Sequence, residues 1–383
     1  MDTPLSICII SDDFLPAATG VGTHVQLIGK ELARRGHKIA VLTSRRPGEQ
    51  EIEHWEGVTV YRAFTLKVAG FYQALPSKTT IKRILEQVKP DLVHHHYLSI
   101  LLKRTYNVAR AMGIPQIYTY HMTVDHLTQP FFMRPFRGLI SRQIVDSCNR
   151  FTQILCPSAS LSKQLPGMGI HAPVRYISNP VVFDDTASVQ PASRGPEFTI
   201  LFAGRFEPEK NVSFLLQAFK LLLNQLPDAT LWLAGRGSLR ETLERQAAEL
   251  GISNRVQFLG FLDHPSLASR YAACDVFVLP ALVEVQPLVA MEAMWFGRPV
   301  IVTRAIVAAT EMVEQGVNGY IVDPESAEDL AERLATLAAD PTLRASQGEA
   351  SRRRANAYRP ELVVDELEAT YRNIVASKAS EQK

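Results

Sequence analysis

The sequence has few cysteines and no long apolar run, and both absences narrow the class of protein. Only four of the 383 residues are cysteine, and they are scattered through apolar segments without metal-ligand spacing. We expect them to be buried free thiols in a reducing compartment. No run of about 18 apolar residues is present to span a membrane. Because Met1–Leu5 lacks the charged start of a signal peptide, the sequence predicts a cytoplasmic protein.

Composition and charge indicate a folded chain with one basic region. Hydrophobic residues make up 46% of the chain and charged residues 21%, which excludes a disordered protein, and the length suits two domains. Residues 61–150 carry 13 Lys and Arg against 4 Asp and Glu, although the whole chain has a net charge of only +2. Such asymmetry suggests that this region meets an anionic partner, such as a membrane surface or a phosphorylated molecule. A solvated basic face that only aids solubility is an equally open interpretation.

Strand-like and helix-like segments alternate along both halves of the chain. The strands expected in the first half are residues 6–11, 39–44, 91–96, 116–121, 153–158 and 174–180. A helix is expected to begin at Thr23 or His24, after the first strand, and to close at Gly36. The strands expected in the second half are residues 198–204, 229–235, 255–260, 276–281 and 298–303, with a helix over 211–227.

This alternation predicts an α/β protein with two doubly wound, Rossmann-like domains that face a central cleft. We place the first domain at residues 1–182, a linker at 183–196 and the second domain at 197–357. A C-terminal helix and tail follow at 358–383. The amphipathic stretch 360–376 is expected to be helical and to cross back to the first domain, with residues 377–383 frayed. Ligands of such sheets bind beyond the carboxyl ends of the strands.

Two cations follow the first strand of the second domain. Arg205 and Lys210 bracket a turn directly after residues 198–204. Arginine can bind a diphosphate with two parallel hydrogen bonds, and lysine can bind it as a point charge. An ordinary exposed loop with solvated charges is the alternative.

A pair of glutamates spans a turn into a later helix. Glu284 follows the strand at 276–281, and Glu292 lies about one turn inside the next helix, whose N-terminus can bind phosphate. Glu292 can accept hydrogen bonds from a ribose diol, and Glu284 from the hydroxyls of a bound sugar. Many helices begin with such a pair, so the spacing alone is weak. Gly235 lies in another strand-to-helix turn, where glycine permits close approach to a nucleotide or simply makes the turn.

The first domain offers glycines and histidines. Gly22 lies in the first strand-to-helix turn, but Val25 replaces the last glycine of G-x-G-x-x-G, so ordinary dinucleotide binding is disfavoured. His94 and His96 share one side of a strand, without cysteine or carboxylate partners at metal spacing, so we expect no metal site there. His121 ends another strand and can meet a reacting group or be structural.

Together and in this order, these segments resemble the retaining glycosyltransferases of family four, which have the GT-B fold. The resemblance extends over nearly the whole chain and rests on TGVGTHVQLIGKELARRGH, DLVHHH, TYHMT, FAGRFEPEKN, LAGRGSL, VQFLGF and the Glu-x7-Glu segment followed by EAMWFGRPVIVT. It implies that the second domain binds a nucleotide-sugar donor and the first domain binds an acceptor.

The resemblance also implies roles for single residues. Arg205 and Lys210 match the family's diphosphate clamp, Glu292 the ribose-binding glutamate and Glu284 the glutamate that contacts the donor hexose. The donor-binding set it implies is Gly22, Arg205, Lys210, Gly235, Glu284, Gln286, Leu288 and Glu292. The catalytic set it implies is His121, Glu284, Arg205 and Lys210.

Three positions depart from the family pattern. Thr19 replaces a common glycine, which should stiffen the first loop. Pro287 replaces another glycine and, having no N–H, removes one phosphate-binding donor. Gln286 replaces a frequent aromatic residue, which leaves the preference for hexose and base open.

The activity implied is retaining transfer of a hexose without a metal or other cofactor, since the D-x-D signature of metal-dependent sugar transfer is missing. The favoured donor is UDP-glucose, followed by GDP-mannose. The favoured acceptor is a lipid or lipid-linked molecule at the inner membrane face, where Arg134, Arg137 and Arg142 beside the aromatic cluster 131–137 can meet anionic headgroups. A soluble acceptor remains open, as do a sugar-nucleotide epimerase and a non-catalytic nucleotide-binding module.

Overall fold

The chain divides into two compact units. The computed structural model describes residues 3–16, 19–68, 71–128, 131–181 and 186–381. Unit 1 comprises Met1–Val124, Pro135–Pro180 and Pro360–Lys383, and unit 2 comprises Asp125–Arg134 and Val181–Arg359. The C-terminal helix α14 (Pro360–Glu381) thus belongs to unit 1, as expected of a helix that returns to the first domain.

The segment Asp125–Arg134 is a correction to the expected first domain, because it groups with unit 2. This segment lies near the loop after β11, since Lys210 and Arg205 are close enough to His126 for both cations to lower its pKa.

Unit 1 contains one eight-stranded sheet with the strand order β10-β9-β8-β7-β1-β2-β4-β3. All neighbouring strands are parallel except β3 and β4. The strands are β1 (Ser6–Ile10), β2 (Lys38–Ser44), β3 (Ile52–Trp55), β4 (Val58–Ala63), β7 (Leu92–His95), β8 (Gln116–Thr119), β9 (Gln153–Cys156) and β10 (Val174–Tyr176). An antiparallel pair, β5 (Thr65–Val68) and β6 (Phe71–Ala74), forms a small second sheet.

Helices cover both faces of this sheet, which explains why its strands are apolar throughout. The helices and turns between residues 20 and 168 are α1 (Gly20–Arg34), α2 (Lys78–Val88), α3 (Ile100–Ala111), α4 (Val124–Leu127), η1 (Phe131–Phe136), α5 (Arg137–Cys148), α6 (Ala159–Gln164) and η2 (Pro166–Met168). On one face, α1 contacts α14, and Ile28 and Leu32 share a buried cluster with Leu367. On the other face, α2 contacts α3, and Ile81 and Leu101 are buried with strand residues.

Two expected helix ends were wrong. Helix α1 begins at Gly20 rather than at Thr23 or His24, because the Thr19 hydroxyl accepts a hydrogen bond from the Gly22 N–H at 3.0 Å and caps the helix three residues earlier. Helix α14 continues to Glu381 instead of fraying after Ala376. The Ser377 and Ser380 hydroxyls bond carbonyls four residues earlier, which is compatible with continued helix.

Unit 2 contains a six-stranded, all-parallel sheet with the order β13-β12-β11-β14-β15-β16. Its strands are β11 (Thr199–Ala203), β12 (Thr230–Ala234), β13 (Val256–Gly260), β14 (Val276–Leu279), β15 (Val300–Thr303) and β16 (Gly319–Val322). This is the doubly wound order of a Rossmann fold, in which the chain changes direction between the first and fourth strands. The reversal lies between β11 and β14, and their carboxyl ends are therefore where a ligand is expected.

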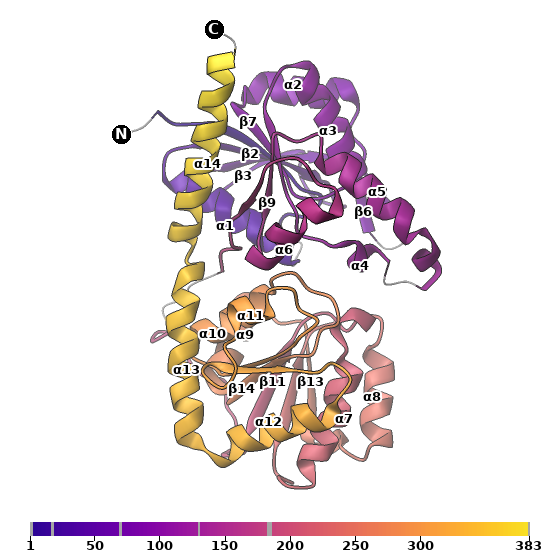
Figure 1. Cartoon of the computed structure of the whole chain (residues 1–383), viewed down its shortest axis with the longest axis vertical. Helices are drawn as coiled ribbons and strands as arrows, with labels where there is room; N and C mark the ends of the chain where they lie inside the picture. Colours follow the sequence, from indigo (N-terminus) through magenta and orange to yellow (C-terminus); the bar gives the residue numbers. More distant parts are fainter. Residues whose placement is uncertain (1–2, 17–18, 69–70, 129–130, 182–185, 382–383) are drawn as a thin grey trace. The chain divides into compact units, whose positions relative to one another are not determined.

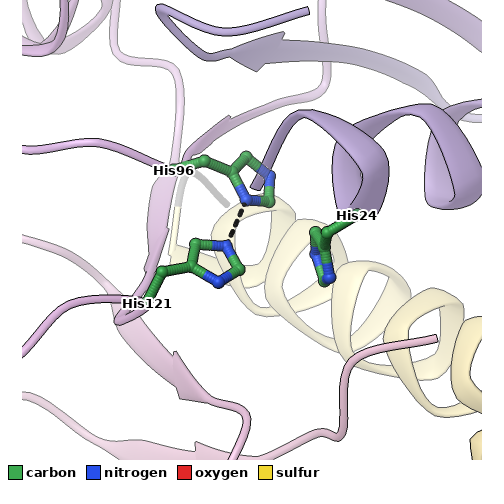
Figure 2. A group of neighbouring side chains, drawn as sticks. All are labelled: His24, His96 and His121. Carbon is green, nitrogen blue, oxygen red and sulfur yellow. Dashed lines mark hydrogen bonds between the residues drawn. The ribbon is translucent and has the colours of Figure 1, made fainter. Parts of the chain in front are cut away.

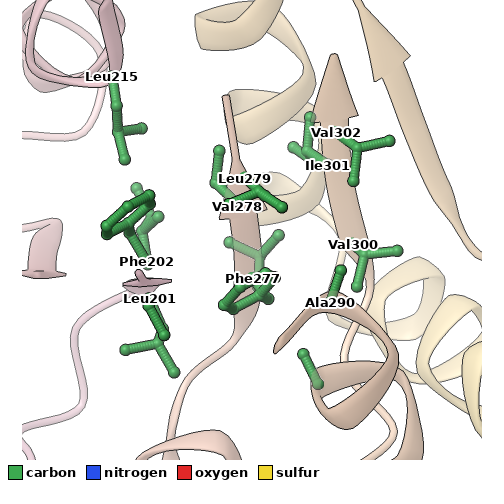
Figure 3. Close-up of a cluster of buried hydrophobic side chains, with 14 of the residues drawn as sticks. Leu201, Phe202, Leu215, Phe277, Val278, Leu279, Ala290, Val300, Ile301 and Val302 are labelled. Atoms are coloured by element: carbon green, nitrogen blue, oxygen red, sulfur yellow. The ribbon is translucent and has the colours of Figure 1, made fainter. Parts of the chain in front are cut away.

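Helices lie on both faces of the unit 2 sheet (Figure 1). They are α7 (Val212–Leu223), α8 (Arg240–Glu249), α9 (His264–Ala273), α10 (Leu288–Trp295), α11 (Ala309–Met312), α12 (Ala327–Ala339) and α13 (Pro341–Ala355), with short turns η3 (Pro208–Lys210), η4 (Ser253–Arg255) and η5 (Asn356–Tyr358). Figure 3 shows the core beside the reversal, where Phe202 of β11 and Phe277 of β14 are fully buried. This packing fixes two strands: β11, which precedes Arg205 and Lys210, and β14, which precedes Glu284.

Candidate active site

The expected diphosphate residues and the first glutamate meet at the reversal in unit 2. Lys210 ends the turn η3, which follows β11, and its ammonium contacts the Glu284 carboxylate, which follows β14. The two side chains are only 12% and 20% exposed. Arg205 is 59% exposed, and its guanidinium donates to Glu209 at 2.6 Å. The structure therefore brings Arg205, Lys210 and Glu284 into one loop cluster.

Backbone contacts hold this cluster in place. The Leu282 N–H donates to the Glu209 carbonyl at 2.8 Å, which ties the loop after β14 to η3. The N–H of Val307 donates to the Glu284 carbonyl at 3.0 Å. These two bonds fix the backbone of the loop that carries Glu284, and its side chain is held by the contact with Lys210.

Burial changes the proton affinity of Lys210. Removal from water, and next the charge of Arg205, lower the pKa of Lys210 to about 8. Burial and then the charge of Lys210 lower the pKa of His126 to about 4, so His126 is neutral near pH 7. An anion that entered this cluster would meet a poorly hydrated ammonium, which binds it more strongly than a fully solvated one.

Gly235 supports the cluster by permitting a close backbone approach. Its φ of 152° lies in the region that favours glycine, and a Cβ atom there would overlap the Gly204 backbone. Nearby, the Glu207 carboxylate accepts hydrogen bonds from the Ser238 N–H and hydroxyl at 3.0 and 2.7 Å. The turn after β12 is therefore locked against the turn after β11. The approach to Gly204 fits the simple turn that the sequence left open for Gly235, and its contact with a nucleotide stays a prediction.

Glu292 lies inside helix α10, as expected from the sequence. It is 6% exposed, and its Oε2 accepts a hydrogen bond from the Tyr271 hydroxyl at 3.0 Å. Pro287 precedes the helix and provides no side-chain cap, while Gln286 and Leu288 are buried at 5% and 8% exposure. The Glu292 carboxylate is consequently oriented by a buried tyrosine before any ligand binds.

Unit 1 contains a separate cluster of histidines. His24 comes from α1, His96 follows β7 and His121 follows β8. The His96 Nδ1 and His121 Nε2 atoms are 3.0 Å apart and share a hydrogen bond (Figure 2). Burial lowers the pKa of all three rings, to about 4 for His24, so each imidazole is neutral near pH 7.

His94 and His96 share one side of the strand end, as predicted, with ring centroids 4.0 Å apart. The two ring nitrogens of His94 are bonded to Tyr371 and Thr119, each at 2.6 Å. His94 is therefore structural, and it forms a base beneath the His24, His96 and His121 cluster.

The remaining expected residues belong to neither cluster, although Gly22 lies on the same helix as His24. The Gly22 N–H is already bonded to Thr19, so a phosphate would have to displace that bond. Arg137 and Arg142 are exposed on α5. The side chain of Arg134 lies outside the described residues.

Sequence reasoning missed several partners. Glu209 pairs with Arg205, Glu207 bonds Ser238, and Tyr271 bonds Glu292. Only Glu207 and Glu209 carried a signal, since they lie within the same charged turn as Arg205 and Lys210. His24 lies in a helical segment far from the other histidines, so spacing could not join it to them.

Two family models together match almost the whole chain. Residues 18–185 match the model described as Glycosyltransferase Family 4, and residues 184–354 match the model described as Glycosyl transferases group 1. The chain belongs to glycosyltransferase family 4. It is an enzyme that transfers a sugar from a nucleotide-sugar donor.

Three relatives of similar sequence differ in the activities that their names give. Glycogen synthase of Mycobacterium tuberculosis is 28% identical over 395 residues, which cover 94% of this chain and 91% of that protein. Alpha-monoglucosyldiacylglycerol synthase of Streptococcus pneumoniae is 24% identical over 320 residues, covering 78% and 70%. The GDP-mannose-dependent alpha-mannosyltransferase of Corynebacterium glutamicum is 26% identical over 335 residues, covering 84% and 77%.

Solved structures share the fold. Sucrose-phosphate synthase from Thermosynechococcus elongatus has a TM-score of 0.82 at 22% identity, covering 97% of this chain and 99% of that chain. Anabaena HepE in complex with UDP-glucose has a TM-score of 0.77 at 20% identity, covering 96% and 100%. The predicted GT-B fold is confirmed.

The pKa of Lys210 predicts an alkaline limit to donor use. Lys210 is charged below about pH 8 and loses its proton above that value, so kcat/KM for the donor should fall as pH rises through about 8. In Lys210→Arg the guanidinium stays charged, and the falling limb should move to higher pH. Steady-state rates measured across this range at varied donor concentration test both expectations. A wild-type profile that stays flat through this range would show that Lys210 does not bind the donor in its charged form.

The two glutamates should have separable effects. Glu292→Gln should weaken binding of the free nucleoside diphosphate, because a ribose contact exists with or without the sugar. Glu284→Gln should not weaken that binding, yet it should reduce transfer. Calorimetry of the nucleoside diphosphate and transfer assays on both variants give the comparison. Equal loss of nucleoside diphosphate affinity in both would contradict the assignment.

Proposed function

We propose that this enzyme moves a hexose from UDP-glucose to a hydroxyl of a lipid or lipid-linked acceptor at the inner membrane face. The transfer retains the configuration of the anomeric carbon and uses no metal. GDP-mannose is the second candidate donor. The observation that carries the proposal is the cationic cluster at the unit 2 reversal, where Lys210 is buried against Glu284 and Arg205 lies in the same turn. Its charges and its place in the sheet suit a diphosphate.

The cluster can stabilise the leaving group. As the bond between the sugar and the diphosphate breaks, negative charge grows on the departing phosphate oxygen. Arg205 and Lys210 are fixed donors for that charge, which is electrostatic stabilisation of the transition state. A bound diphosphate would compete with Glu284 for the Lys210 ammonium, which frees the Glu284 carboxylate to accept hydrogen bonds from the hexose.

The other donor contacts follow from burial and orientation. The Glu292 carboxylate, aligned by Tyr271, is suited to accept hydrogen bonds from the ribose hydroxyls. His121 is neutral and is suited to bond a hydroxyl of the donor sugar rather than to act as a cation. These roles agree with those that the family resemblance implies for the same positions.

Retention is best explained by reaction on one face of the sugar. The bond from the anomeric carbon to the phosphate oxygen breaks, and the departing oxygen takes the proton of the acceptor hydroxyl. The acceptor oxygen then bonds the anomeric carbon on the face that the phosphate left. This route needs no covalent nucleophile, which a double displacement requires.

The lipid acceptor is supported by an exposed apolar and basic surface on unit 1. At the start of α5, Phe136 and Leu139 are 53% and 57% exposed beside the exposed Arg137 and Arg142. Phe64 is 57% exposed in the same unit. In the part of the chain that the structure describes, no helix has the length and apolar character to cross a bilayer. The similarity to alpha-monoglucosyldiacylglycerol synthase favours the same class of acceptor.

A soluble acceptor is the second candidate. It is favoured by the similarity to glycogen synthase, which covers more of the chain than the similarity to the diacylglycerol enzyme. The epimerase and the non-catalytic module that the sequence left open are disfavoured by membership of a glycosyltransferase family.

A panel of nucleotides should identify the donor. UDP at about 100 times its dissociation constant should stabilise the protein by about 2.7 kcal/mol. GDP and ADP at the same concentration should stabilise it less, because they bind more weakly. Thermal unfolding measures the shift, and transfer from UDP-glucose confirms the donor.

Treatment with EDTA should leave transfer largely unchanged, because cations of the protein already face the diphosphate. Stabilisation by GDP alone, or activity that returns only with Mg²⁺ or Mn²⁺, would contradict this donor and this mechanism.

Vesicle binding should distinguish the acceptor classes. The wild-type protein should bind anionic vesicles at low salt and release them as salt is raised, because ions screen the attraction. Each cation near the surface contributes about 1 kcal/mol, so Arg137→Glu with Arg142→Glu should weaken binding by more than about 10-fold. The matched control reverses the charge of two exposed lysines elsewhere on unit 1, Lys38→Glu with Lys163→Glu. Wild-type protein that ignores anionic vesicles would favour the soluble acceptor.

A further inference from the structure

Three histidines of unit 1 converge from elements that are distant in sequence. His24 comes from α1, and His96 and His121 come from the ends of two adjacent strands, β7 and β8 (Figure 2). One ring nitrogen from each residue lies within 4.8 Å of the other two. His24 and His96 are buried, and His121 is partly exposed, which leaves one side open to a small ion.

Several nitrogens in this cluster have no hydrogen bond. Both ring nitrogens of His24 and the Nε2 atom of His96 are buried without a partner. Burial lowers the pKa of His24, and the neighbouring Asn179 side chain opposes this effect. Buried polar atoms are normally satisfied, so unpartnered ones call for an explanation. Imidazole nitrogens that face one point are suited to a transition-metal ion.

We propose that His24, His96 and His121 together bind one Zn²⁺ ion or a similar transition-metal ion, with water or an anion in the fourth position. Nitrogens held tetrahedrally at roughly 2.0–2.1 Å from one zinc ion lie about 3.3 Å apart. The His96 Nδ1 and His121 Nε2 atoms already lie 3.0 Å apart. Only the His24 ring has to move closer, from a separation of at most 4.8 Å.

A metal ion needs an unprotonated nitrogen on each ring. Burial keeps the three imidazoles neutral, so none of them has to release a proton to solvent before it binds a metal ion. The hydrogen bond between His96 and His121 would be lost, and its proton would move to the other nitrogen of the same ring. His94 packs against His96 and is itself fixed by Tyr371 and Thr119, so the base of the site is rigid.

The ion would inhibit the enzyme, and this consequence rests on the proposed role of His121. A nitrogen bound to zinc cannot also bond the donor sugar. The proposed site is therefore inhibitory, and the proposed transfer reaction does not require its ion.

Zinc binding can be measured without any activity assay. The full chain is treated with EDTA, freed of chelator and titrated with Zn²⁺ by calorimetry. We expect one ion per chain at micromolar free Zn²⁺, and Co²⁺ should give the intense visible absorption of a tetrahedral site. His24→Gln and His96→Gln should each weaken Zn²⁺ binding by at least 10-fold, as expected when one ligand of three is lost. His171→Gln, which changes an exposed histidine, is the matched control.

Two checks keep the result interpretable. Each variant should retain thermal unfolding and UDP binding close to those of the wild type, and using two variants guards against one that misfolds. Absence of wild-type Zn²⁺ binding, or an equal loss in His171→Gln, would overturn the site. Binding without inhibition of transfer would overturn the inhibitory role alone. Transfer measured without zinc tests the proposed function independently.

Discussion

The partly buried ion pair between Lys210 and Glu284 is the interaction on which the proposed donor site depends. An ammonium held away from water is stable only with a partner, so the loops after β11 and β14 must present both groups at once. They can do so because the sheet reverses direction between these two strands, which leaves their carboxyl ends open to loops rather than to a crossing helix. The Leu282–Glu209 backbone bond connects these two loops, and the packing of Gly235 on Gly204 fixes the loop after β11 against the turn after β12.

The two units contribute different chemistry. Unit 2 offers charge, in Arg205 and Lys210, with the acceptor oxygens of Glu284 and Glu292. Unit 1 offers neutral imidazoles, because burial suppresses the charge of His24, His96 and His121. A charged cluster suits a diphosphate, and a neutral cluster suits hydroxyl groups. The neutral ring of His121 fits its proposed contact with a hydroxyl of the donor sugar, while the charged cluster fits the diphosphate.

The sequence predicted β1, β2 and β7 to β15, because most of these parallel strands are continuous apolar runs, such as 198–204 for β11 and 276–281 for β14. It did not predict β3 to β6 or β16. It also placed Arg205, Lys210, Glu284 and Glu292 at strand or helix ends. It did not predict that Lys210 pairs with Glu284, since 74 residues separate them. For the same reason it missed the histidine cluster, which only the fold assembles. The start of α1 was wrong because the glycines after Thr19 looked like loop residues, although the threonine caps a helix that contains them.

The most direct test of the donor site is the turnover of Arg205→Ala and Lys210→Ala. Loss of one fixed donor to the leaving diphosphate should lower kcat by roughly 10²–10³ in each variant. Because Arg205 is mostly exposed, its variant should unfold within about ±0.5 kcal/mol of the wild type, so that loss of activity cannot be attributed to misfolding. Near-normal turnover in both variants would contradict the assignment of this cluster to the diphosphate.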